Sequence, residues 1–360
     1  MADAWVRGQP ATLERAITEA AKLLQQSRLP VIAGLGTDVA GARAAIALAR
    51  RVGGVIDHMH SAALLRDLNA MREGGMMITT PNEARLRADL LLLVGPGLLE
   101  VWPELPARLL ARPDGGKRRI VWLCPGDGTG NLGAAVETIG KDPAELPVLL
   151  AALRARCAGR PAGKPPIDAQ KLDALAADLT KSHFGVAVWS AAEQDELALE
   201  MLCGLVKDLN ATTRFTGLPL VPPDNAAAVQ QASGWLTGFP LRTGFARGYP
   251  EHDPWRFDAI RLVDSGEADC ALWISAFRPT PPAWSHDLPT IALTPTLDGF
   301  RRPPEVAIAV GRPGVDHDAV EHLPATGTLT AVSAGKSSSA LAVATAIARI
   351  TAVLPTAEPC

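Results

Sequence analysis

The sequence predicts an α/β protein of two Rossmann-like, three-layer units with mostly parallel sheets. Apolar runs that do not alternate with polar residues, such as 88–95 and 119–124, are typical of strands buried on both faces. Helical patterns separate these runs along nearly the whole chain, which favours parallel strands joined by helices. The Pro/Gly-rich linker 158–167 divides two such series, so we expect one unit over 1–157 and another over 168–360, between which the chain can cross.

The elements of the first unit follow from apolar spacing and from capping residues. Thr12 is suited to cap a helix whose apolar residues recur at helical intervals from Leu13 to Leu24. A buried strand over 29–34 then ends in glycine. The other elements expected in this unit are a helix over 38–52 and strands over 54–57, 88–95 and 119–124.

The second unit continues the same alternation. We expect helices over 167–181, 191–209, 257–265 and 337–353, and strands over 185–190, 269–275, 290–294 and 305–310. Between them, residues 234–250 contain four glycines, two prolines, four aromatic residues and two arginines, which argues against a regular helix. A loop of this composition lines a pocket, contacts a partner or packs between layers.

Composition narrows the function classes. A chain of 360 residues that is 48% hydrophobic supports two sizeable cores, and a net charge of −3 gives no field suited to nucleic acid or an anionic membrane. No apolar run approaches the ~20 residues that span a bilayer, and the N-terminal residues lack a signal-peptide pattern, so we expect a soluble cytoplasmic protein. The five cysteines include no Cys-x-x-Cys pair, which argues against a zinc ribbon, a local iron–sulfur motif and a disulfide framework.

Two glycine-containing segments have some features of nucleotide-binding motifs. Gly34 and Gly36 follow a strand and precede a helix, but Val39 stands where a dinucleotide fingerprint needs its third glycine. The segment 333–338 has a Gly-Lys-Ser sequence, but Thr330 replaces the first glycine of a phosphate loop. A tight turn is favoured for the first segment, and helix capping by Ser337 and Ser338 for the second.

Two groups of side chains are of metal-ligand type. The first group is Asp57, His58 and His60, and the second is Asp316, His317, Asp318, Glu321 and His322. In the second group, the two histidines are five residues apart, which does not place them on one helix face. Solvated charges at a helix entry are therefore the favoured interpretation of this group. No Ser/His/Asp or Cys/His arrangement stands out, and no catalytic residue is expected.

Eight segments spread over nearly the whole chain form a recognisable pattern. They are 10–17, 30–34, 86–90, 205–210, 213–215, 235–240, 245–250 and 262–272. Together they resemble the B subunit of formylmethanofuran dehydrogenase, in particular its counterpart in the bacterial formyltransferase/hydrolase complex of methylotrophs. The resemblance is most specific over 235–250.

The resemblance implies a relative of the molybdopterin oxidoreductases, whose dehydrogenase members hold a tungsten or molybdenum pterin and an iron–sulfur cluster. The cluster ligands belong before the first helix, and no cysteine precedes Thr12. The metal-ligating Cys or selenocysteine belongs after the strand 54–57, where the sequence from Asp57 to Arg66 contains none. We therefore expect a fold without the iron–sulfur domain and a chain that binds no cofactor. His58 or His60 as a replacement ligand remains open.

The implied function is that of a non-catalytic structural subunit. Formyltransferase and hydrolase partner subunits would convert formyl-tetrahydromethanopterin to formate by way of a methanofuran-type carrier during formaldehyde oxidation. The alternative is an active formylmethanofuran dehydrogenase-type oxidoreductase subunit with an atypical ligand set. A nucleotide-binding enzyme that uses Gly34 and Gly36 is the third reading.

The resemblance also suggests site residues. Vestigial-pocket candidates are His58, His60, Arg242 and Arg247. Independently of the resemblance, residue type gives Asp316, His317 and His322 as a weaker metal alternative. Candidate contacts for the anionic polyglutamate tail of the carrier are Arg242, Arg247, Arg256, Arg301 and Arg302. Solvated or core-paired arginines are the other interpretation.

Overall fold

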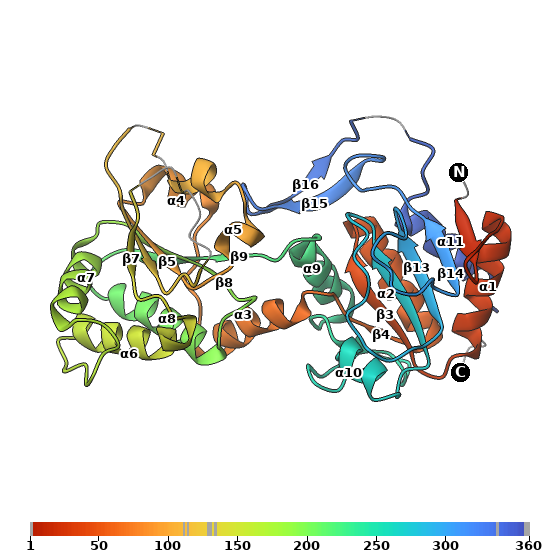
Figure 1. Cartoon of the computed structure of the whole chain (residues 1–360), viewed down its shortest axis with the longest axis horizontal. Helices are drawn as coiled ribbons and strands as arrows, with labels where there is room; N and C mark the ends of the chain where they lie inside the picture. Colours follow the sequence, from red (N-terminus) through yellow and green to blue (C-terminus); the bar gives the residue numbers. More distant parts are fainter. Residues whose placement is uncertain are drawn as a thin grey trace. The chain divides into compact units, whose positions relative to one another are not determined.

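The computed structural model describes residues 3–110, 112–113, 115–127, 132, 135–335 and 338–355. Lys336 and Ser337 of the segment 333–338, and Cys360, lie outside the described residues. The chain forms two compact units (Figure 1). We call Met1–Ser61, Pro223–His322 and Leu329–Cys360 the discontinuous unit, and Ala62–Pro222 with Leu323–Thr328 the inserted unit.

A nine-stranded mixed sheet forms the centre of the discontinuous unit, in the order β11-β10-β4-β3-β12-β13-β14-β1-β2. The five strands from β4 to β14 are parallel, whereas β1, β2, β10 and β11 add antiparallel edges. The strands are β1 (Ala4–Val6), β2 (Gln9–Pro10), β3 (Pro30–Gly36), β4 (Val55–Ile56), β10 (Thr243–Gly244), β11 (Glu251–His252), β12 (Cys270–Ser275), β13 (Thr290–Thr294) and β14 (Val306–Ala309). Every residue of β3 and β12 is buried, as the continuous apolar runs predicted.

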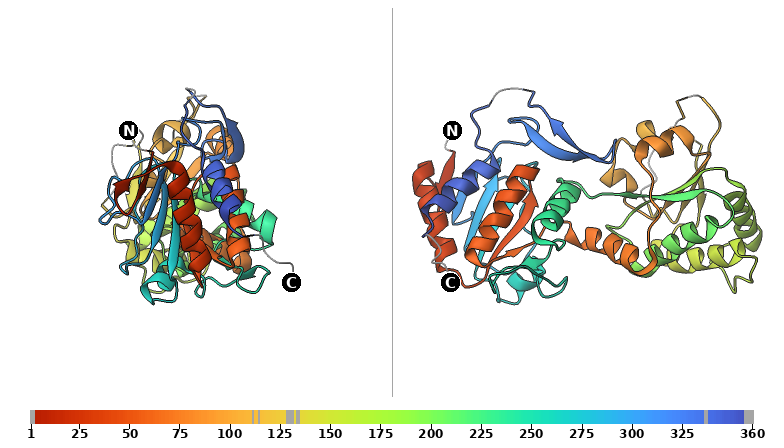
Figure 2. Two further views of the ribbon diagram at one scale, coloured as in Figure 1. Left: turned by 90° about the vertical axis from the view of Figure 1, so that its right-hand side faces the viewer. Right: turned by 180° about the vertical axis from the view of Figure 1, so that it is seen from behind.

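Helices pack on this sheet. They are α1 (Leu13–Gln26), α2 (Val39–Val52), α9 (Ala226–Thr237), α10 (Ala259–Asp264) and α11 (Val343–Val353). Neighbouring helices α1, α11, α2 and α9 contact one another in that order (Figure 2). Thr12 caps α1 by accepting a hydrogen bond from the backbone N–H of Arg15, as predicted. The last helix begins at Val343 rather than at residue 337.

The inserted unit has a parallel five-stranded sheet in the order β7-β6-β5-β8-β9. Its strands are β5 (Leu90–Val94), β6 (Arg119–Leu123), β7 (Glu137–Ile139), β8 (Gly185–Ser190) and β9 (Phe215–Leu220). Its α-helices are α3 (Ser61–Gly74, whose first residue belongs to the other unit), α4 (Pro81–Arg87), α5 (Leu98–Val101), α6 (Leu146–Cys157), α7 (Ala169–Lys181) and α8 (Glu196–Leu209). Leu90 and Leu92 enter one apolar cluster, and Leu91 and Leu93 enter another, so both faces of β5 are buried.

The structure divides the chain at other positions than the linker 158–167. This linker joins α6 to α7 within the inserted unit. The reason is strand pairing: β5 pairs with β6, which precedes the linker, and with β8, which follows it. Pro/Gly density therefore marks a loop here, whereas the chain passes between the units near residues 61, 222, 322 and 328.

Two further segments differ from expectation. Residues 234–237 form the last turn of α9, so the irregular loop begins at Gly238, whose left-handed φ of 80° ends the helix. The charged group 316–322 leads into a strand rather than a helix. This strand, β15 (Ala319–Leu323), pairs with β16 (Thr328–Val332) in a separate two-stranded sheet. In the part of the chain that the structure describes, no helix combines the length and apolar character needed to cross a bilayer.

Gly34 is required by a close backbone contact inside the nine-stranded sheet. Its φ is +79°, and an added Cβ would lie 2.5 Å from the Ile274 carbonyl oxygen. We expect Gly34→Ala to lower the free energy of unfolding by about 3 kcal/mol, through left-handed strain and overpacking. Gly234→Ala is the control: this helical glycine has no neighbouring atom within 4 Å, so alanine should stabilise by roughly 0.5–1 kcal/mol. Urea unfolding checks both, and equal effects would contradict the contact.

Candidate functional site at the carboxyl edge of the nine-stranded sheet

The carboxyl ends of β4, β3 and β12 lie side by side at one edge of the nine-stranded sheet. The chain runs from β3 to β4 on one side, and β12 lies on the other side of β3. Ligands of open α/β sheets bind outside the carboxyl ends of the strands, at such a reversal of strand order. Residues 57–61 follow β4, and the Ala276 N–H binds the Gly36 carbonyl oxygen, 2.7 Å away. This edge is the natural place to look for a site.

Asp224 is the centre of the polar contacts at this edge. Its carboxylate oxygen Oδ2 lies 3.1 Å from His60 Nε2 and 2.7 Å from Arg278 Nη2. Burial opposes the charge of Asp224, but the hydrogen bonds from His60 and Arg278 outweigh burial and hold its pKa below the ordinary value. Asp224 and Asn225 both have left-handed φ values, which turns the chain before α9. Asp224 is therefore an ionised carboxylate already paired within the chain.

The contacts of His58 fix its tautomer. Nε2 lies 3.1 Å from the carbonyl oxygen of Asp224, which can only accept, so Nε2 carries the proton. Nδ1 then accepts a hydrogen bond from the His60 backbone N–H, 3.0 Å away. Burial, with a smaller effect of His60, lowers the pKa of His58 to about 4. This neutral ring has no free lone pair for a metal ion, whereas the side chain of His60 is 29% exposed.

Asp57 and Arg242 form a buried contact beside this group. The Asp57 carboxylate accepts from the Ala259 N–H at 3.0 Å and lies 3.6 Å from Arg242 Nε. Arg242 Nη2 lies 2.6 Å from the Asp258 carboxylate, and Nη1 donates to the Pro254 carbonyl oxygen. Burial raises the pKa of Asp57 to about 6, although the Arg242 charge lowers it. Of the sequence-predicted candidates, Arg242 is thus core-paired close to His58.

The first turn of α2 is occupied by side chains of the chain itself. Asp38 Oδ1 accepts the Gly41 N–H at 2.9 Å and so caps the helix. A Cβ added at Gly36 would lie 3.2 Å from Met59 Cε and 3.5 Å from Asp224 Cβ. A nucleotide phosphate binds at a free, electropositive helix N-terminus, and here a carboxylate stands in that position. The geometry therefore argues against the nucleotide-binding reading of Gly34 and Gly36.

In the second predicted group of metal-ligand residues, Asp316, Asp318 and one ring nitrogen of His317 already contact the backbone, whereas His317 Nε2 and Glu321 Oε1 are buried without a hydrogen-bond partner. Asp316 accepts from the Arg312 N–H at 2.8 Å, and Asp318 from the Ala334 N–H at 2.8 Å. His317 Nδ1 lies 2.9 Å from the Asp318 carbonyl oxygen. Within the described ranges, no three His, Cys, Asp or Glu side chains are grouped to hold a metal ion.

Comparison with known proteins assigns the family. No protein-family model matches the chain. The B subunit of the formyltransferase/hydrolase complex Fhc from Methylorubrum extorquens is 38% identical over 323 residues, which cover 86% of this chain and 85% of that protein. The chain belongs to this Fhc B-subunit family. The crystal structure of FhcABCD from Methylorubrum extorquens in complex with methylofuran matches with a TM-score of 0.86 and 35% identity, covering 96% of this chain and 97% of the matched chain.

More distant relatives connect the Fhc B-subunit family to tungsten enzymes. The B subunit of the tungsten-containing formylmethanofuran dehydrogenase 2 is 28% identical over 284 residues in Methanocaldococcus jannaschii and 25% identical over 279 residues in Methanococcus maripaludis. The chain covers 64% of the length of each. The predicted resemblance is confirmed, and the α/β fold, with its mixed nine-stranded and parallel five-stranded sheets, matches the Fhc structure.

The side chains that this chain offers as metal ligands do not fit a tungsten or molybdenum pterin. Such a centre needs a soft thiolate or selenolate ligand. Among the described cysteines, Cys270 begins β12 at the end away from the site, and the other three lie in the inserted unit. Burial raises the pKa of Cys270 to about 12 and of Cys124, Cys157 and Cys203 to about 11. All four are protonated thiols at neutral pH.

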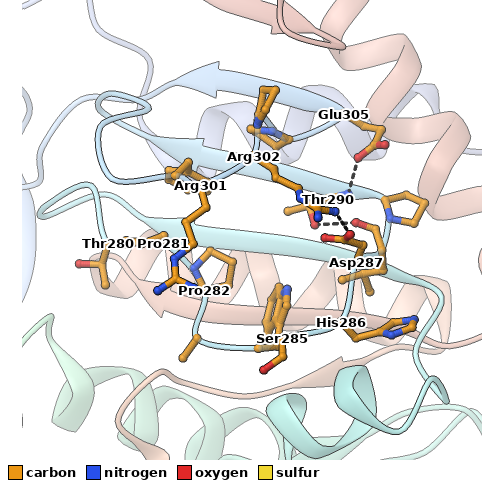
Figure 3. A pocket seen from close by; sticks show the side chains of 17 residues that line it. Thr280, Pro281, Pro282, Ser285, His286, Asp287, Thr290, Arg301, Arg302 and Glu305 are labelled. Atoms are coloured by element: carbon orange, nitrogen blue, oxygen red, sulfur yellow. Dashed lines mark hydrogen bonds and ion pairs between the residues drawn. The ribbon is translucent and has the colours of Figure 1, made fainter.

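The remaining predicted arginines lie away from the carboxyl edge. Arg247 pairs with Glu251 at 3.2 Å, and Arg302 pairs with Asp287. Arg302 and Arg301 border a cavity of about 820 Å³ between loops 280–290 and 300–305. Figure 3 shows Arg301 reaching toward Pro282, on the opposite wall of this cavity.

Sequence reasoning found the histidines of the site but missed Asp224 and Arg278. Both lie far along the chain from His60, which neither spacing nor residue type reveals. The Pro-Pro-Asp-Asn sequence at 222–225 carried a partial signal, because Asn and Asp are the non-glycine residues that most readily adopt a left-handed turn.

Proposed function

We propose that this chain is a non-catalytic, cofactor-free structural subunit of a formyltransferase/hydrolase complex. In that complex, formyltransferase and hydrolase subunits convert formyl-tetrahydromethanopterin to formate by way of a methanofuran-type carrier, as a step of formaldehyde oxidation. The likeness to the Fhc B subunit over most of both chains, and to a chain of an FhcABCD structure that contains methylofuran, supports this role. On this proposal the two units are a molybdopterin-oxidoreductase-like scaffold that has kept its architecture.

The observation that carries the non-catalytic role is the internal pairing at the carboxyl edge. Asp224 is saturated by His60 and Arg278, and His58 has both ring nitrogens engaged. Met59 fills the space beside Gly36. Among the described residues, the edge has no thiolate, and the side chains of Asp224, His58 and His60 are engaged within the chain, which favours a retained structural role. Asp57 Oδ1 and Ser275 Oγ are buried at this edge without a hydrogen-bond partner.

Co-expression with the formyltransferase and hydrolase subunits tests the proposal. We expect native mass spectrometry to show the chain in a heteromeric complex, and elemental analysis to find no stoichiometric tungsten, molybdenum or iron on it. His60→Ala should leave the formyltransferase and hydrolase rates within twofold of wild type, because the His60 side chain contacts Asp224 and His58 of the same chain. Stoichiometric tungsten or molybdenum, with formate-dependent dye reduction that His60→Ala abolishes, would instead support the oxidoreductase alternative. A partner complex that is fully active without this chain would contradict the scaffold role.

A further inference from the structure

Five large apolar side chains of the discontinuous unit are exposed on one short stretch of chain. They are Trp235 (69% exposed), Leu236 (48%), Phe239 (39%), Tyr249 (52%) and Trp255 (70%), and we call them the aromatic patch. With roughly 200 Å² for each fully exposed side chain, these fractions leave on the order of 500 Å² of apolar surface. That summed area is a large share of the ~800 Å² that one partner buries in a standard protein interface.

The patch is held in a fixed shape by the loop beneath it. Strands β10 and β11 pair as a short hairpin, and Arg242 ties this hairpin to the Asp57 and Asp258 carboxylates. Phe239 stacks on His252 with ring centroids 6.3 Å apart. The Arg261 guanidinium lies 4.4 Å from the centroid of the Trp255 ring. Such preorganised aromatic side chains lose little conformational entropy when a partner binds them.

The charged residues around the aromatic patch favour a different protein, rather than a second copy of this chain, as its binding partner. Arg256 is exposed beside Trp255, and its guanidinium lies 5.2 Å from the Phe257 ring centroid. Among the described residues it forms no ion pair within 4.0 Å, although the Asp253 and Glu267 carboxylates attract its charge. Arg247, at the Tyr249 end, is 64% exposed; its Nη1 lies 3.2 Å from the Glu251 carboxylate and donates to the Tyr249 hydroxyl, 3.3 Å away. Two copies that met through this patch around a twofold axis would bring the unpaired Arg256 side chains into one interface, which is unfavourable.

We propose that the aromatic patch is the docking surface for another subunit of the formyltransferase/hydrolase complex. The partner surface that fits has an apolar pocket for Trp255 and Trp235, bordered by carboxylates that face Arg256. This inference rests on the proposed function, because it takes the partner from that complex. Trp, Tyr and Arg are the residues that most often dominate the binding energy of protein interfaces.

The test uses the full-length chain and the purified complex of the other subunits. We expect Trp255→Ala and Trp235→Ala each to weaken binding at least tenfold in biolayer interferometry, and Arg256→Glu to weaken it most at low salt. Leu197→Ala, a change at a 52% exposed side chain of the inserted unit, is the control and should bind as wild type. Circular dichroism and urea midpoints must match wild type for each variant that is compared.

The outcomes separate the two proposals. Folded tryptophan variants that bind with wild-type affinity would overturn the docking surface and leave the proposed function intact. A wild-type chain that binds none of the other subunits would overturn both. Light scattering could instead show that the wild-type chain is a homodimer and that Trp255→Ala dissociates it. The patch would then bind a second copy of this chain, and the inference would be overturned.

Discussion

Arg242→Met is expected to lower the free energy of unfolding of the discontinuous unit by about 3–5 kcal/mol. The Arg242 side chain is only 16% exposed and contacts Asp57, Asp258 and the Pro254 carbonyl oxygen. Its loss leaves the buried Asp57 carboxyl without a counter-charge and unties the loop that carries the aromatic patch. Urea unfolding followed by circular dichroism measures the change.

A matched pair of variants controls this result. Arg247→Met removes an arginine from the same loop, but its ion pair with Glu251 is exposed, so no measurable change of the urea midpoint is expected. Adding Asp57→Asn to Arg242→Met should recover part of the loss, because the unpaired carboxyl is then gone. Equal midpoints for the Arg242 and Arg247 variants would show that the buried pair contributes nothing.

The second large effect is a change in the pH dependence of stability at Asp57 and His58. Asp57 has its pKa raised from 3.8 to about 6, so between these values the folded state holds a proton that the unfolded state has lost, and stability falls as pH rises. His58 has its pKa lowered from 6.5 to about 4, so the unfolded state holds the extra proton, and stability falls as pH falls through this window. The two neighbours oppose each other.

Single substitutions should expose each contribution. Asp57→Asn leaves only the His58 effect, so relative to wild type the variant should lose roughly 3 kcal/mol between pH 6.5 and pH 4. His58→Gln leaves only the Asp57 effect and should gain a similar amount over the same change. Urea midpoints measured as differences from wild type at each pH cancel the contributions of other buried groups, such as Asp67, whose pKa is also raised to about 6. Parallel pH profiles for wild type and both variants would contradict these buried ionisation states.

Sequence patterns predicted the elements whose burial is continuous. The strands β8 and β13 agree with the expected ranges 185–190 and 290–294 to the residue, because each apolar run is bounded by polar or turn residues. The antiparallel edge strands β10 and β11 have two residues each, too few to show a period. The unit boundaries escaped prediction because strand pairing between distant segments, and not local composition, decides which residues share a core.

The site shows the same limit at the level of side chains. Residue type brought His58 and His60 forward, and the family resemblance added Arg242, but neither could show what each side chain contacts. Asp224, which pairs with His60, lies more than 150 residues further along the chain. Arg242 pairs with Asp57, which precedes it in sequence, and with Asp258, which follows it. An arginine suited to an anionic ligand and an arginine that neutralises a buried acid have the same sequence signature.

The discontinuous unit also has a consequence for how the chain folds during synthesis. Pro30 of β3 pairs with Cys270 of β12, a partner two-thirds of the chain away in sequence. The separation between β1 and its partner β14 is still larger. All five strands of the inserted unit lie between residues 90 and 220, so its sheet can close while β3 and β4 remain without their later neighbours. The inserted unit can therefore complete its sheet before the discontinuous unit that begins the chain, and apolar strand edges from the first sixty residues stay unprotected until the last third of the chain has emerged.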